Sequence, residues 1–114
     1  MAFTVVEYLR ADGSSPFGRW FDGLDSQAAA KVAVARARLE LGNTSNVKRI
    51  GTISEYRIDW GPGYRIYLAI EDGSLVILLG GGTKRSQRSD IRRAQELFDE
   101  YRRRKVAPSG ARGA

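Results

Sequence analysis

The sequence predicts a single α+β domain, and three patterns support this prediction. A β-branched and aromatic run over residues 3–9 is typical of a strand. Two segments with apolar residues at helical spacing follow within residues 14–42. The second half alternates polar and apolar residues before a last helical segment over residues 86–105. The expected order is an N-terminal strand, two helices, a three-stranded antiparallel meander that joins the sheet, and a C-terminal helix.

The length of 114 residues suits one hydrophobic core. We expect residues 1–107 to form the domain and residues 108–114, which begin at a proline, to form a flexible tail. No apolar run approaches the roughly 18 residues that a membrane helix needs, and the first residues lack a secretory pattern. The sequence therefore predicts a cytoplasmic protein without a membrane partner.

Capping residues predict where the first two helices begin. Ser14 or Ser15 can cap a helix whose first turn takes Pro16, and Asp25 or Ser26 can cap the next. Gly42 is expected to end the second helix. The apolar residues at helical spacing are expected in the core: Phe17, Trp20, Phe21, Leu24, Ala28, Val32, Ala35 and Leu39.

Residues 54–70 alternate in the manner of a β-hairpin around Gly61-Pro62-Gly63. If the apolar sides of the two arms pack on the helices, polar side chains gather on the other side of the same strands. The predicted polar cluster consists of Glu55, Arg57, Arg65 and Tyr67.

Residues 75–79 form an unbroken apolar run, which predicts a strand buried on both faces. Gly80-Gly81-Gly82 follows and is expected to leave the strand, with Lys84 and Arg85 beyond it. Bare backbone beside two cations would let a phosphate approach closely. The alternative is that the glycines only let the sheet meet a helix. A third helix is expected from Ser86 or Ser89.

The composition restricts the chemistry. The chain has a net charge of +6, and it contains no cysteine and no histidine. Thiolate nucleophiles, the usual zinc ligands and imidazole proton transfer are therefore excluded, and we predict neither a metal site nor a cofactor. The positive excess lies after residue 47 and suggests an anionic partner.

Three segments resemble the signature of the RelE/HigB-like addiction-module killer proteins of the RelE/ParE toxin superfamily. They are Glu55-Tyr56-Arg57-Ile58, Gly61-Pro62-Gly63-Tyr64-Arg65-Ile66-Tyr67 and Leu78-Leu79-Gly80-Gly81-Gly82-Thr83-Lys84. The similarity extends through Ser86-Gln87, Asp90-Ile91 and Ala94. It covers nearly the whole chain except the tail.

The resemblance implies a RelE/ParE-type fold and the toxin of a type II toxin-antitoxin system. Such a toxin is an mRNA endoribonuclease, or mRNA interferase, that cleaves mRNA on the ribosome and so inhibits translation. It also implies a cognate antitoxin, usually a helix-turn-helix DNA-binding protein, and contact with operator DNA only through that antitoxin. By the same resemblance, Arg65 meets the scissile phosphate, and Arg57 and Lys84 or Arg85 complete the site.

The predicted chemistry needs no metal, because RNA supplies its own nucleophile, the 2′-hydroxyl. Arg65 and Arg57 suit the role of charge clamps on the phosphate. Either Glu55 or Lys84 could accept the 2′-proton. The candidates for further RNA contact are Arg85, Tyr67 as a base-stacking ring, Lys48 and Arg49.

Two other functions are compatible with these residues. ParE-like toxins share the fold but bind and poison DNA gyrase, so the fold alone does not decide the target. A binding module without catalysis would use the same positive face for RNA or for a protein. The ion pairs expected between Glu55 and Arg57 or Arg65 could also be ordinary decoration of a sheet.

Overall fold

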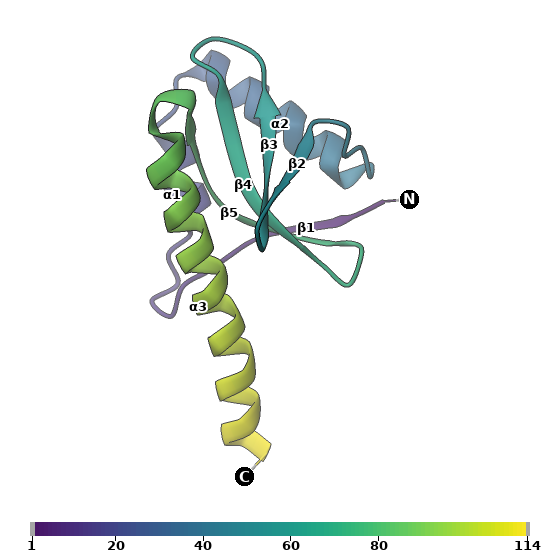
Figure 1. The fold of residues 1–114 in the computed structure, drawn as a ribbon, viewed down its shortest axis with the longest axis vertical. Coiled ribbons are helices and arrows are strands. Elements are labelled where there is room, and N and C mark those ends of the chain that lie inside the picture. The colour runs from purple at the N-terminus through teal and green to yellow at the C-terminus, as the bar shows by residue number, and fades with distance from the viewer. Residues whose placement is uncertain (1, 114) are drawn as a thin grey trace.

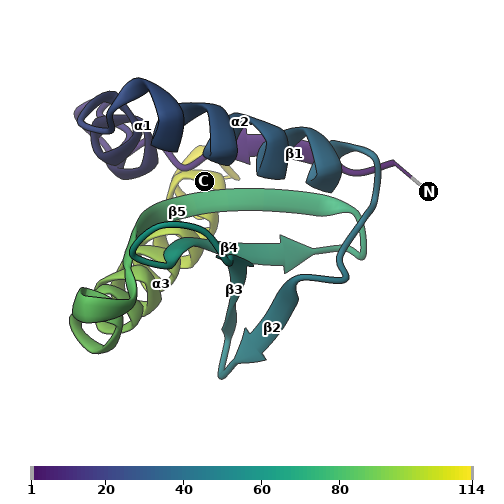
Figure 2. The same cartoon turned by 90° about the horizontal axis from the view of Figure 1, so that it is seen from above.

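The computed structural model describes residues 2–113, with side chains described for residues 2–105. The chain forms an α+β fold in which a five-stranded mixed sheet carries helices on both faces (Figures 1 and 2). The elements in chain order are β1 (Thr4–Glu7), α1 (Pro16–Asp22), α2 (Ser26–Glu40), β2 (Val47–Ile50), β3 (Ile53–Ile58), β4 (Tyr64–Glu71), β5 (Leu75–Thr83), the 3-10 helix η1 (Lys84–Ser86) and α3 (Gln87–Gly113). The α+β prediction is thus confirmed.

The first two helices begin at one member of each predicted pair of capping residues. The Ser15 side chain accepts the backbone N–H of Gly18, and the Asp25 side chain accepts that of Ala28, both at 2.9 Å. These bonds satisfy amide groups that have no partner inside the helix. Gly42 follows α2 with a φ of +85°, a conformation that favours glycine at a helix end.

The sheet order is β1-β5-β4-β3-β2, with β1 parallel to β5 and the other pairs antiparallel. Since side chains alternate across a strand, the sheet has two cores. One face packs on α1 and α2 through a buried cluster: Phe17, Val32, Ala35, Leu39, Tyr56, Ile66, Leu68, Val76 and Leu78. The other face packs on α3 through a second cluster: Tyr8, Ile53, Tyr67, Ala69, Ile77, Leu79, Ala94, Leu97 and Phe98.

The antiparallel meander has four strands rather than the predicted three. The additional strand is β2, which pairs with β3 in a register that sets Val47 against Tyr56 and Ile50 against Ile53. Only four residues long, β2 carries two cations between two apolar residues, so its own pattern is weak. Its pairing with β3, rather than its own sequence pattern, makes β2 a strand.

The three glycines lie inside β5, not in a loop after it, and pair with Tyr67, Ile66 and Arg65. A Cβ on Gly81 would lie 2.4 Å from the ring of Trp20, and one on Gly82 would lie 1.8 Å from Oδ2 of Asp90. Glycine is therefore needed at positions 81 and 82, because α1 and α3 pack directly on the strand there. The alternative interpretation is correct, and the expected open backbone for a phosphate is wrong at Gly81 and Gly82.

Helix α3 continues to Gly113, whereas the sequence predicts its end near Lys105. None of the helices in the described residues is long and apolar enough to cross a membrane.

Candidate functional site

The β3–β4 hairpin sets Arg57 directly opposite Arg65. Residues opposite each other in an antiparallel pair project on the same face of the sheet, here the face that also carries α3. Two like charges at this position destabilise a strand pair unless a negative group lies between them. The sequence correctly predicted that both arginines share the face of Glu55 and Tyr67.

Glu55 supplies the negative group. Its side chain has no exposed surface, and its Oε2 lies 2.8 Å from Nε of Arg57. Its Oε1 lies 3.8 Å from Nε of Arg65. The side-chain amide of Gln87 donates to both oxygens, at 3.0 and 3.3 Å. A buried carboxylate needs such partners to offset the loss of its hydration, and in return it fixes both arginines.

Arg65 is held on a second side by the turn of the hairpin. The residue is 8% exposed, and its guanidinium donates to the carbonyl oxygen of Gly63 at 2.8 Å. The same carbonyl accepts the backbone N–H of Lys84 at 2.9 Å. Arg65 Nε, also buried, has no hydrogen-bond partner among the described residues. Arg57 differs from Arg65 in that 47% of its side chain is exposed.

Lys84 and Arg85 lie in η1, between β5 and α3, and both are exposed. A Cβ at position 63 would lie 3.2 Å from a guanidinium nitrogen of Arg65 and 3.5 Å from Cβ of Lys84. The first side-chain carbon of Lys84 and the Arg65 guanidinium therefore both lie next to Gly63. The structure brings three of the predicted catalytic residues, Arg57, Arg65 and Lys84, to one place with Glu55 beneath them.

The burial of Glu55 favours Lys84 over Glu55 as the proton acceptor. A group that accepts the 2′-proton must touch the RNA, and this carboxylate is enclosed by Arg57, Arg65 and Gln87. Its position instead makes Glu55 a positioning residue for the arginines.

The stacking role of Tyr67 is a wrong prediction. The residue is 1% exposed and belongs to the core beneath α3. Its hydroxyl has no hydrogen-bond partner among the described residues, and burial, followed by the nearby carboxylates of Glu55 and Asp90, raises its pKa. A ring covered in this way cannot stack on a base.

The two cations of β2 point in different directions. Lys48 pairs with Glu55 in the ladder, so it projects on the face of the site. Arg49 projects on the other side of the strand and donates to the carbonyl oxygen of Gly51 at 2.8 Å. The structure therefore places Lys48 on the face of the cluster and Arg49 on the opposite face.

Sequence reasoning assigned no role to Gln87 and Asp90, although both were placed in the first turn of the last helix. Gln87 holds Glu55, and Asp90 accepts a hydrogen bond from the Ser86 hydroxyl while lying against Gly82. The available signal in the sequence was that both residues follow Lys84 and Arg85 within a few positions. The distance of 32 residues between Gln87 and Glu55 hid their contact.

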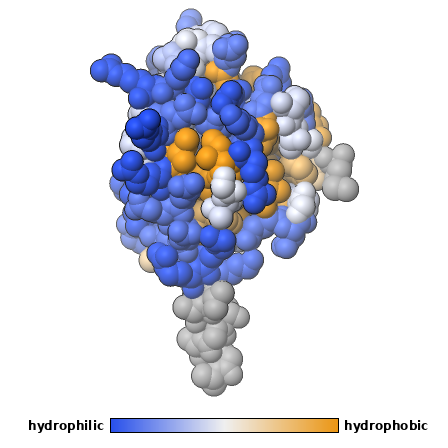
Figure 3. Space-filling model, viewed as in Figure 1, coloured by the Kyte–Doolittle hydropathy of each residue, from blue (hydrophilic) through white to orange (hydrophobic). Residues whose placement is uncertain are grey.

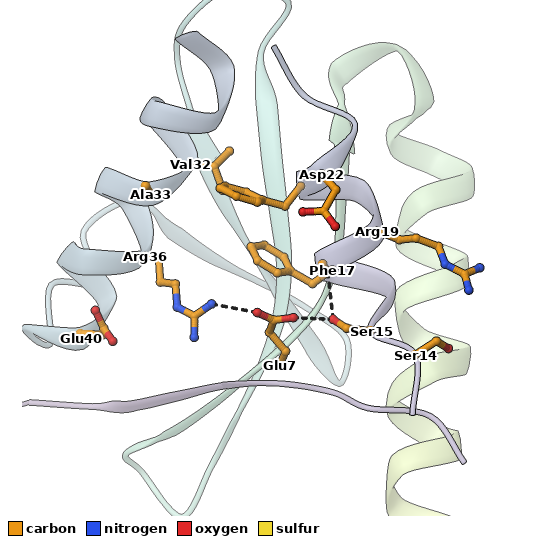
Figure 4. A pocket seen from close by; sticks show the side chains of 12 residues that line it. Glu7, Ser14, Ser15, Phe17, Arg19, Asp22, Val32, Ala33, Arg36 and Glu40 are labelled. Atoms are coloured by element: carbon orange, nitrogen blue, oxygen red, sulfur yellow. Dashed lines mark hydrogen bonds and ion pairs between the residues drawn. The ribbon is translucent and has the colours of Figure 1, made fainter. Parts of the chain in front are cut away.

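A hollow of about 550 Å³ lies between α1, α2 and the end of β1 (Figure 4). It is on the face of the sheet opposite to Arg57 and Arg65. Within it, the Glu7 carboxylate accepts the Ser15 hydroxyl at 2.6 Å and a guanidinium N–H of Arg36 at 3.2 Å. Phe17 and Val32 line its apolar part. Glu7 thus joins three elements, and its contacts are explained by the fold.

The comparisons with known proteins define a family. No family model matches the chain. A Haemophilus influenzae protein described as uncharacterized is 43% identical over 86 residues, which make up 74% of this chain and 87% of the relative. The chain belongs to the family of this Haemophilus influenzae protein. The description of the relative assigns the family no activity, so the geometry of the arginine cluster carries the functional argument.

In this member of the family, the cluster can bind an anion without a metal. Arg57 and Lys84 are exposed, and Arg65, on the strand between β3 and β5, is buried. Guanidinium groups stay charged and present planar pairs of donors that match phosphate oxygens. Among the described residues, no group of three or more His, Cys, Asp or Glu side chains is arranged to hold a metal ion. Figure 3 shows hydrophilic side chains around an apolar patch on the face that α3 shares with the neighbouring strands.

Proposed function

We propose that this protein is a RelE/HigB-like toxin with the RelE/ParE fold, and that it cleaves mRNA on the ribosome without a metal. The observation that carries the proposal is the pair Arg57 and Arg65, fixed side by side on one buried carboxylate with Lys84 beside them. A purely structural ion pair requires one cation for one carboxylate. The extra positive charge at this position suits a phosphate.

In the proposed reaction, the 2′-hydroxyl oxygen of a ribose attacks the adjacent phosphorus atom. The 2′-hydroxyl gives up its proton, the bond from phosphorus to the 5′-oxygen of the next nucleotide breaks, and that oxygen takes up one proton in turn, so no proton is gained or lost overall. The products are a 2′,3′-cyclic phosphate and a 5′-hydroxyl. Arg65 and Arg57 stabilise the charge that develops on the phosphate oxygens, which is the role that preorganised donors perform best.

Lys84 is the candidate for the proton acceptor once Glu55 is assigned to positioning. It is exposed, and its Cβ lies over the same glycine as the Arg65 guanidinium. Glu55 and Gln87 keep the two guanidinium groups in place before RNA arrives. This preorganisation reduces the cost of ordering long side chains in the transition state.

The proposal includes two partners in the cytoplasm. The ribosome would present the mRNA strand, and a cognate antitoxin with a helix-turn-helix DNA-binding domain would neutralise the toxin. Operator DNA would be contacted only by that antitoxin within the complex. The net charge of +6 supports binding to the ribosome, because ribosomal RNA and mRNA are both polyanions.

The test is brief induction of the protein in bacteria, followed by mapping of new RNA 5′-ends and analysis of the end groups. We expect cuts inside translated codons, with 5′-hydroxyl ends, that disappear with Arg65→Ala. The matched control is Arg38→Ala, which removes an exposed arginine from α2 on the other face of the sheet and should leave the cuts unchanged.

Growth arrest without cuts would reject the nuclease and favour the gyrase poison. Cuts that bear 5′-phosphates would reject the proposed attack by the 2′-hydroxyl. If Arg65→Ala lost RNA binding and cleavage equally, the arginine would serve binding alone, whereas a clamp on the transition state should lower the rate more than the affinity.

A further inference from the structure

A basic stripe that the proposed reaction does not use runs from η1 into the N-terminal part of α3. Arg85, Arg88 and Arg92 are exposed and lie three and four residues apart. At this spacing, side chains fall on one side of a helix, about 6 Å apart along its axis for four residues. The stripe begins at Arg85, the residue that follows Lys84 of the arginine cluster in the chain.

None of these three arginines lies within ion-pair distance of a carboxylate in residues 2–105. The C-terminal part of the same helix differs. There Arg102 binds Asp99 at 2.7 Å and lies over the Phe98 ring at 4.5 Å, and Lys105 binds Glu71 at 3.1 Å. Arg102 and Lys105 therefore each have a carboxylate partner, whereas Arg85, Arg88 and Arg92, like Arg103, have none among the described residues.

The stripe is unfavourable for the helix itself. Arg88 is in the first turn of α3, where the helix dipole disfavours cations, and Arg92 is four residues further on, where two like charges repel each other. Asp90, the acidic residue of that turn, accepts from Ser86 and lies against Gly82 instead. An external anion bound to these arginines would offset the destabilisation that their charges cause in the helix.

We propose that Arg85, Arg88 and Arg92 bind successive phosphates of an RNA strand that continues from the site at Arg57 and Arg65. The inference rests on the proposed function for the identity of the strand. A polyanion would relieve the repulsion between the arginines and release its counterions, and both effects favour binding.

The test measures binding by fluorescence anisotropy over a range of salt concentrations. The probe is a labelled single-stranded oligonucleotide with 2′-O-methyl groups, which cannot be cleaved because the nucleophile is blocked. For a single strand, each lost phosphate contact lowers the salt slope by about 0.7, so Arg88→Gln with Arg92→Gln should lower it by about 1.4. The control pair, Arg102→Gln with Lys105→Gln, removes the same charge from residues of α3 that have carboxylate partners and should change the slope much less.

An equal change in both pairs would overturn the proposal, because net charge alone would then explain binding. An unchanged slope in Arg88→Gln with Arg92→Gln would also overturn it. A second arm repeats the titration with ribosomes that carry no mRNA. A change confined to that arm would overturn the proposed binding of the cleaved strand and assign the phosphates to ribosomal RNA, whereas a change confined to the oligonucleotide would support the proposal.

The result is independent of the proposed cleavage. If the parent protein makes no cuts but the slope falls as expected, the nuclease proposal fails and the phosphate-binding stripe stands. If the parent cuts mRNA and the slope does not fall, the reverse holds. Thermal unfolding of each pair verifies that the variants fold, and we expect Arg88→Gln with Arg92→Gln to unfold no earlier than the parent because a repulsion is removed.

Discussion

Gln87 donates its side-chain amide to both carboxylate oxygens of Glu55, at 3.0 and 3.3 Å, and so joins the first residue of α3 to β3. The same carboxylate holds Arg57 and Arg65 on its other side. The start of the helix and the arginine pair are thus coupled through one buried group. Changes to that group should affect both folding and the site.

Glu55→Ala should lower the free energy of unfolding by about 3–5 kcal/mol, because it leaves the buried Arg65 guanidinium without its carboxylate. The comparison is Asp59→Ala, an exposed carboxylate that follows β3, for which we expect a change within about 0.5 kcal/mol. Urea denaturation of both variants measures the difference. Equal losses would show that the carboxylate of Glu55 has no special structural role.

The glycine run should respond unevenly to alanine. Gly81→Ala and Gly82→Ala should each cost about 1–3 kcal/mol, because a Cβ would meet Trp20 or Asp90. Gly80→Ala should stay within about 1 kcal/mol of the parent, since nothing lies within 4 Å of its Cβ position. Thermal or urea denaturation distinguishes the three. A large loss at Gly80 would contradict the packing described for β5.

Tyr67→Phe should stabilise the protein by about 1 kcal/mol, because it removes a buried hydroxyl that has no hydrogen-bond partner among the described residues. It should leave mRNA cleavage unchanged. Tyr101→Phe is the matched control, since that hydroxyl donates to Glu71 at 2.9 Å and its loss should cost about 1 kcal/mol. Loss of cleavage in Tyr67→Phe at normal stability would restore a functional role for this hydroxyl.

Glu100 should contribute a pH-dependent part of the stability. Hydrogen bonds from Arg10 and then from Tyr8 lower the pKa of this carboxyl. A lowered pKa means that the contribution is complete above the unfolded value of about 4.3 and is lost as the pH falls through the folded value. Glu100→Gln should therefore lower stability at pH 7, and its difference from the parent should shrink below about pH 4.

Urea denaturation between pH 7 and pH 2 measures this dependence. Glu96→Gln is the control, because Glu96 is exposed on the same helix and makes no ion pair among the described residues. A difference between Glu100→Gln and the parent that stayed constant down to pH 2 would show that the carboxylate does not act through its charge.

Local rules were sufficient where neighbouring residues decide the structure. The caps at Ser15 and Asp25 and the hairpin over Gly61-Pro62-Gly63 follow from short-range geometry; the hairpin was predicted, and each cap is one of the two residues predicted for it. Alternation along β3 and β4 also predicted the shared face of Arg57 and Arg65.

The tertiary structure alone decided which polar residues of that face are reached by solvent. Alternation assigned Tyr67 and Glu55 to the same side as the arginines, but α3 lies across that side and buries both. Strand β2 and the contact between Gln87 and Glu55 likewise depend on elements distant in the chain. The sequence by itself determined the order of the elements other than β2 and η1, and it determined the direction of the side chains on β3 and β4, since both arise from interactions between near neighbours. Burial depends on which element packs over a face, so only the folded chain separated the exposed Arg57 and Lys84 from the enclosed Glu55 and Tyr67.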